Sequence, residues 1–125
     1  NDGDVDIVVV NLNEPPSLLR NDVSGDGHWL KVLLQGVKSN RSAIGARVLV
    51  HAGTRTEAQA VISQSSFYSS NDPRLHFGLG DVATVSLEIV WPNGGREVIP
   101  RVAANQLVTI REGSGIVPNR GWAKN

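Results

Sequence analysis

A strict alternation of apolar and polar residues is the feature that most constrains the fold of this chain. From residue 85 to residue 91, every second side chain is apolar: Val85, Leu87, Ile89 and Trp91. The residues between them include Thr84, Ser86 and Glu88 on the opposite face. A period of two is typical of a β-strand that buries one face. Val90 interrupts the polar face, which indicates a central strand with neighbours on both sides.

The same pattern predicts strands along most of the chain. We expect them at residues 7–10, 28–35, 46–52, 55–63, 75–77, 84–91, 96–100 and 106–112. Tight turns are expected at Ala52-Gly53-Thr54 and at Pro92-Asn93-Gly94-Gly95, where glycine can adopt positive φ. Residues 102–105 could form one helical turn at most.

These strands predict an all-β fold, a compact antiparallel β-sandwich of about seven or eight strands. The expected core consists of alternate residues of the predicted strands: Val32, Leu34, Val48, Val50, Val85, Leu87, Ile89, Val108 and Ile110. Trp29 and Trp91 are expected in core or half-buried positions rather than as platforms for sugar. Alternation is lost from residue 114, so residues 114–125 are predicted to form a C-terminal tail, with Trp122 either loose or docked.

Composition excludes several classes of site. The chain has no cysteine, which excludes disulfides, thiolate metal sites and cysteine nucleophiles. Residues 1–27 carry one arginine and six acidic residues (1 − 6 = −5), and residues 28–125 carry eleven basic and six acidic residues (11 − 6 = +5). The basic residues form no run, which favours a solvated mixed surface over a nucleic-acid interface. No apolar run reaches the ~20 residues that a membrane span needs.

The first six residues, Asn1-Asp2-Gly3-Asp4-Val5-Asp6, alternate acidic residues around a glycine. Asp2, Asp4 and Asp6 would place carboxylate oxygens on one side of a tight turn, and Ca²⁺ takes six to eight oxygen ligands. A full loop of this kind needs further acidic residues upstream. We therefore expect these 125 residues to be a piece of a longer protein, with calcium bound in the parent and an incomplete site here.

Spaced motifs follow one another between Trp29 and Glu112. They are Trp29-Leu30, residues 39–48 (SNRSAIGARV), residues 70–80 (SNDPRLHFGLG), residues 87–94 (LEIVWPNG) and Ala104-Asn105-Gln106. In this order they resemble the ASPIC/UnbV domain, over about two-thirds of the chain. The resemblance implies a β domain without an established enzymatic activity.

Residues 1–9 (NDGDVDIVV) look like the second half of an FG-GAP (VCBS) repeat, which resembles an integrin-α propeller blade. In that resemblance Asp2 and Asp6 occupy ligand positions, and Asp4 looks like a backbone-carbonyl donor. It implies a large secreted or surface protein. The expected domains are a truncated repeat end and linker at 1–27, the ASPIC/UnbV-like domain at 28–113 and the tail at 114–125.

Two groups of residues have side chains of the types found in catalytic or metal-binding sites, and a structural interpretation is favoured for both. Asp72 and His76 with Ser69 and Ser70 supply the residue types of a catalytic triad, but no G-x-S-x-G elbow is present. We favour a turn capped by Asp72, with His76 joining a strand to a neighbouring loop. The histidines His28, His51 and His76 lie on separate segments without zinc-ligand spacing, so independent roles are favoured.

Asn40-Arg41-Ser42 is a formal N-glycosylation sequon inside a family motif, and a structural role is favoured for it.

The function predicted from these observations is non-enzymatic. We expect a binding or architectural module of an extracellular, calcium-dependent repeat protein, whose ligand is another protein or a surface glycan. Secreted, periplasmic or cell-surface locations all agree with this, and the preceding propeller repeats of the same chain are an expected partner. The alternative is a hydrolase or enzyme-accessory domain that uses Asp72 and His76. A third interpretation is purely structural, with the domain sealing the last propeller blade.

Overall fold

The computed structural model describes residues 4–22, 25–66 and 68–119, which form ten β-strands and no helix. The strands are β1 (Ile7–Val9), β2 (Ser17–Leu19), β3 (His28–Gln35), β4 (Arg47–Ala52), β5 (Arg55–Ala60), β6 (Leu75–Gly80), β7 (Thr84–Val90), β8 (Arg96–Ala103), β9 (Gln106–Arg111) and β10 (Gly115–Val117). The all-β prediction is confirmed. Within the described ranges, no helix has the length and apolarity needed to cross a membrane.

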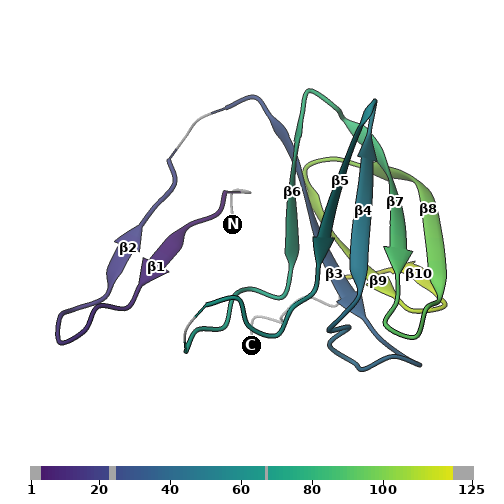
Figure 1. The fold of residues 1–125 in the computed structure, drawn as a ribbon. Helices are drawn as coiled ribbons and strands as arrows, with labels where there is room; N and C mark the ends of the chain where they lie inside the picture. The colour runs from purple at the N-terminus through teal and green to yellow at the C-terminus, as the bar shows by residue number, and fades with distance from the viewer. Residues whose placement is uncertain (1–3, 23–24, 67, 120–125) are drawn as a thin grey trace.

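Two four-stranded sheets form the main body of the molecule, and the β1–β2 hairpin lies apart from them (Figure 1). One sheet has the strand order β10-β9-β3-β6, and the other has the order β5-β4-β7-β8. Apolar side chains from both sheets meet in a single hydrophobic cluster. The arrangement is therefore sandwich-like, because two sheets cover one core.

One strand pair departs from the antiparallel prediction. β3 and β9 run parallel, with Leu30 opposite Gln106 and Gln35 opposite Arg111. Between β3 and β9 the chain forms β4 and β5 of the second sheet, β6 of the first, and β7 and β8 of the second. A crossover of this kind lets two strands run in the same direction. As a result, the ends of β3 and β9 meet at the same edge of the molecule. The loop that follows Gln35 thus lies beside the residues that follow Arg111.

The predicted core is confirmed for every residue proposed from alternation. β7 lies between β4 and β8, as the apolar Val90 on its outer face indicated. Ile89 and Leu87 are fully buried, and Trp91 follows them on the same face with 2% of its surface exposed. Phe77 of β6 and Leu30 of β3 are also fully buried, although the sequence did not single them out as core residues.

Two segment predictions are corrected by strand pairing. The strand expected at residues 75–77 extends to Gly80, because Gly78 and Gly80 pair with the start of β3. Residues 102–105 were expected to form a helical turn at most, yet β8 continues to Ala103, which pairs with Thr84 of β7. β8 is an edge strand of its sheet, where a proline such as Pro100 is tolerated.

The segment predicted to be a C-terminal tail, residues 114–125, begins with a short strand. Gly115–Val117 forms β10, and Ile116 lies opposite Ile110 of β9. The Asn119 side-chain Nδ2 donates to the Leu107 carbonyl at 2.6 Å. Backbone pairing needs no alternating pattern, and it satisfies polar groups of β9 that an open edge would leave unpaired. Trp122 lies outside the described residues.

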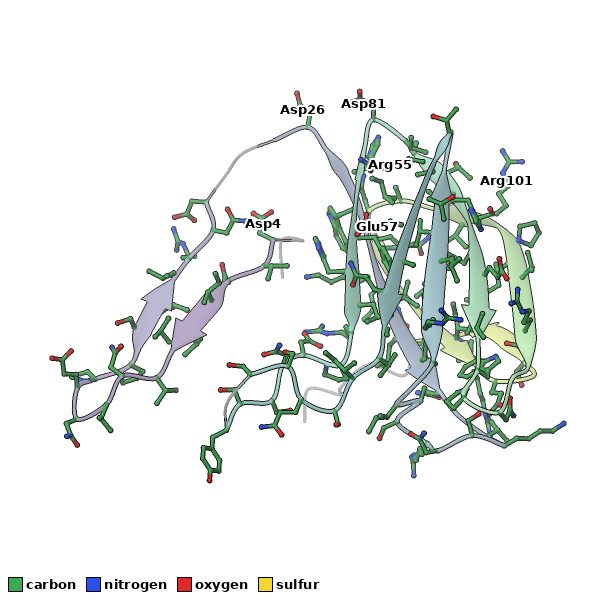
Figure 2. All side chains as sticks on the ribbon, viewed as in Figure 1. Asp4, Asp26, Arg55, Glu57, Asp81 and Arg101 are labelled. Carbon is green, nitrogen blue, oxygen red and sulfur yellow. The ribbon has the colours of Figure 1, made fainter. Side chains whose placement is uncertain are left out.

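The polar face of β5 lies toward the other sheet. Arg55 Nη2 donates to the Gly78 carbonyl at 2.9 Å, and Gln59 Nε2 donates to the His76 carbonyl at 2.7 Å. Both carbonyls belong to β6, the edge strand of the first sheet, so side chains of β5 join the two sheets along this side. Figure 2 labels Arg55 and Glu57 on β5.

The turn between β7 and β8 has the predicted hairpin geometry. The Trp91 N–H donates to the Gly95 carbonyl at 2.8 Å, and the Gly94 N–H donates to the Trp91 carbonyl at 2.9 Å. Gly94 has φ of 87°, a left-handed conformation that glycine adopts without strain. The Trp91-Pro92-Asn93-Gly94 motif therefore forms a tight turn at one end of the second sheet.

The core assignment makes a quantitative prediction. Ile89→Ala should destabilise the domain by ~2–5 kcal/mol, because Ile89 is fully buried and truncation leaves a cavity. Val98→Ala is a suitable control, since Val98 is 66% exposed on β8 and its truncation should change stability by less than ~0.5 kcal/mol. Urea denaturation of both variants measures the difference. Equal effects of the two substitutions would contradict the assignment.

Candidate binding site

Two small clefts lie on the surface of the described residues. One has a volume of about 200 Å³ and is formed by the end of β5 and the loop before β6, including Ser65, Asp72 and Arg74. The other has a volume of about 190 Å³ and lies at the β7–β8 turn, between Trp91, Glu97 and Glu112. The first contains part of the constellation considered above, and the second contains two motif residues, Trp91 and Asn93.

Asp72 has the structural role predicted for it in the first cleft. Its Oδ1 accepts a hydrogen bond from the Arg74 N–H at 2.9 Å, which caps the turn. Its carboxylate also accepts hydrogen bonds from the Arg74 guanidinium, including one from Nε at 2.8 Å. The side-chain hydrogen bond from Arg74 holds the pKa of Asp72 below its usual value, although partial burial acts in the opposite direction.

His76 lies against Trp29 rather than in the lining of the first cleft. The two rings are stacked with centroids 6.4 Å apart and an interplanar angle of 18°. The ammonium of Lys31 lies 5.4 Å from the centroid of the same Trp29 ring. His76 pairs with Lys31 across β3 and β6, so this cluster joins the two strands. The Asp72 carboxylate and the His76 ring thus contact different residues.

The other two histidines also have contacts of their own. His28 Nδ1 lies 2.8 Å from Asn105 Nδ2, and Asn105 Oδ1 accepts from the Trp29 N–H at 3.1 Å. His51 Nδ1 lies 2.9 Å from Thr56 Oγ1, on the second sheet. In the part of the chain that the structure describes, no three His, Asp or Glu residues gather as a metal-binding group.

Glu112 is the central polar residue of the second cleft. It is 8% exposed, and its Oε2 accepts hydrogen bonds from three successive backbone N–H groups: Val37 at 2.7 Å, Lys38 at 2.8 Å and Ser39 at 2.8 Å. Its Oε1 accepts from the Ser39 hydroxyl at 3.0 Å and from the Asn93 amide at 2.8 Å. One carboxylate therefore connects the end of β9, the loop after β3 and the β7–β8 turn.

The electrostatic state of Glu112 follows from these contacts. Burial by itself raises the pKa of the Glu112 carboxyl, but the hydrogen bonds from Ser39, Val37 and Lys38 favour the ionised form. Together they lower its pKa from the ordinary 4.5 to about 2. The residue is thus a carboxylate under neutral and mildly acidic conditions.

Glu97 and Trp91 complete the second cleft. Glu97 Oε1 accepts a hydrogen bond from the Gly113 N–H. The other oxygen, Oε2, is buried without a hydrogen-bond partner among the described residues, and the same holds for Trp91 Nε1. Sequence reasoning missed Glu97 and Glu112 as site residues. The alternation could have indicated them. Glu112 comes two residues after Ile110 and four after Val108, so it continues the buried face of that strand.

The sequon asparagine has a local structural role. Asn40 Nδ2 donates to the Ile44 carbonyl and Asn40 Oδ1 accepts from the Ile44 N–H, both at 2.9 Å. These two bonds close the loop that carries the Glu112 contacts, in agreement with the structural role favoured for Asn40.

Of the predicted calcium ligands, Asp2 lies outside the described residues. Asp6 Oδ1 accepts a hydrogen bond from the Asn21 N–H at 2.9 Å, next to the β1–β2 hairpin. Asp4 is exposed, and Figure 2 shows it near the start of the described chain. Asp4 and Asp6 can supply only part of a six- to eight-oxygen shell.

Comparison with known proteins agrees with the motifs that surround the second cleft. The family model described as ASPIC and UnbV matches residues 36–117, which span β4 to β10 and the loops that contact Glu112. The chain belongs to the ASPIC and UnbV family. The match begins after the acidic segment, so the resemblance of residues 1–9 to an FG-GAP repeat and the domain boundaries at residues 28 and 113 stay predictions.

The chain is also similar to curated proteins named cartilage acidic protein 1. It is 27% identical over 115 residues to the human protein, covering 89% of this chain and 17% of that protein. The mouse protein is 27% identical over 115 residues, covering 89% and 18%. The Xenopus tropicalis protein is 29% identical over 97 residues, covering 74% and 15%. The chain thus spans less than a fifth of the length of these relatives.

The Glu112 contacts predict a specific dependence of stability on pH. Because the pKa of Glu112 is lowered on folding, its ionised form stabilises the fold fully above about pH 4.5, and this contribution is lost as the pH falls toward 2. Glu112→Gln should be less stable than the wild type at pH 7, and the difference should shrink between these two pH values. Urea denaturation of both proteins across this range measures it.

Asn93→Ala is a useful companion variant, since it removes one of the five donors to Glu112 and leaves the other four. The pH-dependent loss of unfolding free energy in Asn93→Ala should be smaller than that in Glu112→Gln. A difference between wild type and Glu112→Gln that stays constant from pH 7 to acid would contradict the role assigned to Glu112.

Proposed function

We propose that this chain is a non-enzymatic binding or architectural module of an extracellular, calcium-dependent FG-GAP repeat protein, with a protein or a surface glycan as its ligand. The observation that carries the proposal is the second cleft. Segments far apart in the sequence, around Val37, Asn93 and Glu112, meet there at the ends of the strands. Loops held at the ends of a rigid sandwich are a common place for recognition.

The contacts of Asp72 and His76 support a binding role over a catalytic one. Asp72 bonds to Arg74 in a capped turn, and His76 stacks on Trp29. A triad needs a base that is hydrogen-bonded to its nucleophile and oriented by a third group. The observed contacts give both side chains structural partners instead.

A hydrolase or enzyme-accessory domain is the second candidate. It is favoured by the first cleft, since Ser65 and Asp72 both contribute to its walls. Ser65 Oγ accepts a hydrogen bond from Asn71 Nδ2, so its hydroxyl hydrogen is free to point elsewhere. A catalytic role would then require Ser65 or a neighbouring serine as the nucleophile.

A single variant separates the two candidates. His76→Ala should lower the melting temperature, because it removes the stack on Trp29 between β3 and β6, with a loss of about 0.5–1.5 kcal/mol beyond the lost burial. Wild-type protein should show only background rates with general esterase, glycosidase and phosphatase substrates. His51→Ala, on the second sheet, serves as the control. Robust wild-type turnover that disappears in His76→Ala at unchanged melting temperature would reverse the assignment.

The proposed setting outside the cytoplasm is supported by the relatives. The relatives carry the name cartilage acidic protein 1, which refers to a tissue rich in extracellular material.

The β1–β2 hairpin exposes apolar side chains on both faces, with Val8 64%, Leu18 65% and Leu19 57% exposed. We propose that preceding propeller repeats of the parent chain cover this hairpin, with the domain sealing the last blade. Secreted, periplasmic and cell-surface locations are all compatible with this.

We propose that calcium binds in the parent protein and not to the 125-residue chain by itself. Asp4 and Asp6, with Asp2, supply part of a shell, and ordering a chain end costs ~1–2 kcal/mol per residue. The 125-residue chain should therefore bind Ca²⁺ no more tightly than roughly millimolar. A chain extended upstream by one repeat should gain the missing ligands, and its stability should rise with free calcium as RT ln(1 + [L]/Kd).

Calorimetry on the two chains tests this, with the melting temperature measured in calcium and in chelator. The short chain should melt at nearly the same temperature in both, and the extended chain should melt higher in calcium. Tight binding by the short chain, or no binding by the extended one, would contradict the interpretation of residues 1–6 as the end of a calcium loop.

A further inference from the structure

The β7–β8 turn carries an asparagine followed directly by a glycine, Asn93-Gly94, and no other asparagine of the chain has this neighbour. We propose that Asn93 is a site of spontaneous deamidation, and that the carboxylate formed there disconnects the β7–β8 turn from Glu112. The inference goes beyond the proposed binding function and does not depend on it. It is carried by the exposure of the turn, by the contacts of the Asn93 amide and by the charge of Glu112.

The Asn93-Gly94 bond is open to solvent. Asn93 and Gly94 are both exposed, and so are their neighbours Pro92 and Gly95. A Cβ atom placed on Gly94 would meet no atom within 4 Å, so the space around this residue is empty of protein. Because Gly94 has no side chain, nothing stands between its backbone nitrogen and the side-chain amide of Asn93 when the turn changes its conformation.

Deamidation of an Asn-Gly pair needs only water and a base from the solvent. The base removes the proton from the Gly94 nitrogen, which then attacks Cγ of Asn93. A bond forms between this nitrogen and Cγ, the bond between Cγ and Nδ2 breaks, and the amide nitrogen leaves as ammonia. Water opens the resulting cyclic imide at either of its carbonyl groups. The product is an aspartate or its β-linked isomer, and no oxidant or reductant takes part.

One contact of the turn favours the attack. Asn93 Oδ1 accepts a hydrogen bond from the Gly95 N–H at 2.9 Å. A donor at this oxygen withdraws electrons from Cγ and stabilises the negative charge that develops on Oδ1 during the attack. A Cβ atom on Gly95 would lie only 3.0 Å from Oδ1, so the absence of a side chain at Gly95 leaves room for this contact.

Two other contacts restrain the reaction. Asn93 Nδ2 donates to Glu112 Oε1 at 2.8 Å, and the Gly94 N–H donates to the Trp91 carbonyl at 2.9 Å. Both bonds must open before the Gly94 nitrogen can reach Cγ. An exposed turn at the end of a sheet opens at a lower free energy than the whole domain. Deamidation in the folded chain should therefore be slower than in a free peptide, and it does not require global unfolding.

The product cannot restore the contact with Glu112. An ionised carboxylate at position 93 has no hydrogen to donate, and it faces a second carboxylate that stays ionised because the pKa of Glu112 is lowered to about 2. Like charges at this distance repel each other. The modification therefore acts in one direction and releases the β7–β8 turn, which also forms part of the second cleft.

The first test measures where and how fast the chain is modified. The intact 125-residue chain is kept at neutral pH for weeks, and peptide mass spectrometry follows the gain in mass at every asparagine. Asn93 should be modified faster than any other asparagine of the chain. A free peptide of residues 91–96 should react faster still, because it lacks the restraint from Glu112.

A variant of Glu112 tests that restraint. In Glu112→Gln the Asn93 amide meets a neutral partner, so the rate at Asn93 should rise by ~3-fold or more while circular dichroism shows the domain folded. Glu57→Gln is the matched control, since Glu57 is a half-buried glutamate on β5 outside the second cleft. It should leave the rate at Asn93 unchanged.

The second test introduces the product directly. Asn93→Asp should lower the melting temperature at pH 7 by roughly 5 °C, and more than Asn93→Ala, which removes the same hydrogen bond without adding a charge. The charge of Glu112 raises the pKa of the new carboxyl on folding, so the destabilisation is present above that pKa. It should disappear below about pH 4, where the protonated carboxyl can donate to the Glu112 carboxylate.

The other charged groups around the turn do not remove this effect. Arg96 is paired with Glu88 at 2.7 Å, and Glu97 Oε1 accepts from the Gly113 N–H. Lys38 lines the same cleft, but its side chain is exposed, and an exposed ion pair contributes little. The carboxylate of Glu112 is therefore the group that decides how a new charge at position 93 is tolerated.

Three results would overturn the inference. A gain in mass at Asn93 no faster than at the other asparagines would remove the modification site. Equal rates in the folded chain and in the free peptide would show that Glu112 does not restrain the amide. A melting temperature of Asn93→Asp at pH 7 equal to that of Asn93→Ala would show that the new charge does not disconnect the turn.

Discussion

The hydrogen bonds to the Glu112 carboxylate are the interactions on which the organisation of one end of this domain depends. Glu112 follows the buried residues of β9, so its side chain enters the molecule where an apolar residue would continue the core. A buried carboxylate is costly unless it is fully hydrogen-bonded. The backbone of residues 37–39 and the Asn93 amide supply those bonds, and in doing so they join the two sheets at the ends of their strands.

The two joins between the sheets differ in kind. Along the β5–β6 side, Arg55 and Gln59 donate to carbonyls of β6, which consumes their polar groups in holding the sheets together. At the Glu112 end, the network satisfies Glu112 but leaves Trp91 Nε1 and Glu97 Oε2 without partners among the described residues.

Much of the fold could be predicted from alternation, and the reason is visible in particular residues. Val85, Leu87 and Ile89 are buried because every second side chain of a strand faces the same way. Alternation could not reveal the parallel pairing of β3 with β9, since both directions bury the same face. It also missed β10, whose three residues are held by backbone pairing with β9. The candidate site was harder to predict than the fold, because the residue types in the sequence pointed to Asp72 and His76 instead.

The sequence by itself determined most of the strands of the two sheets, their buried faces and the family resemblance, because these depend on local periodicity and on motifs that lie within short segments. Only the tertiary structure decided which polar residues meet. Val37, Asn93, Glu97 and Glu112 come from three separated segments. The parallel pairing of β3 with β9 places Val37 beside Glu112, and the β7–β8 turn of the other sheet brings Asn93 to Glu112. Hydrogen bonds act over about 3 Å, so their partners depend on how the chain is folded back on itself and not on spacing along it.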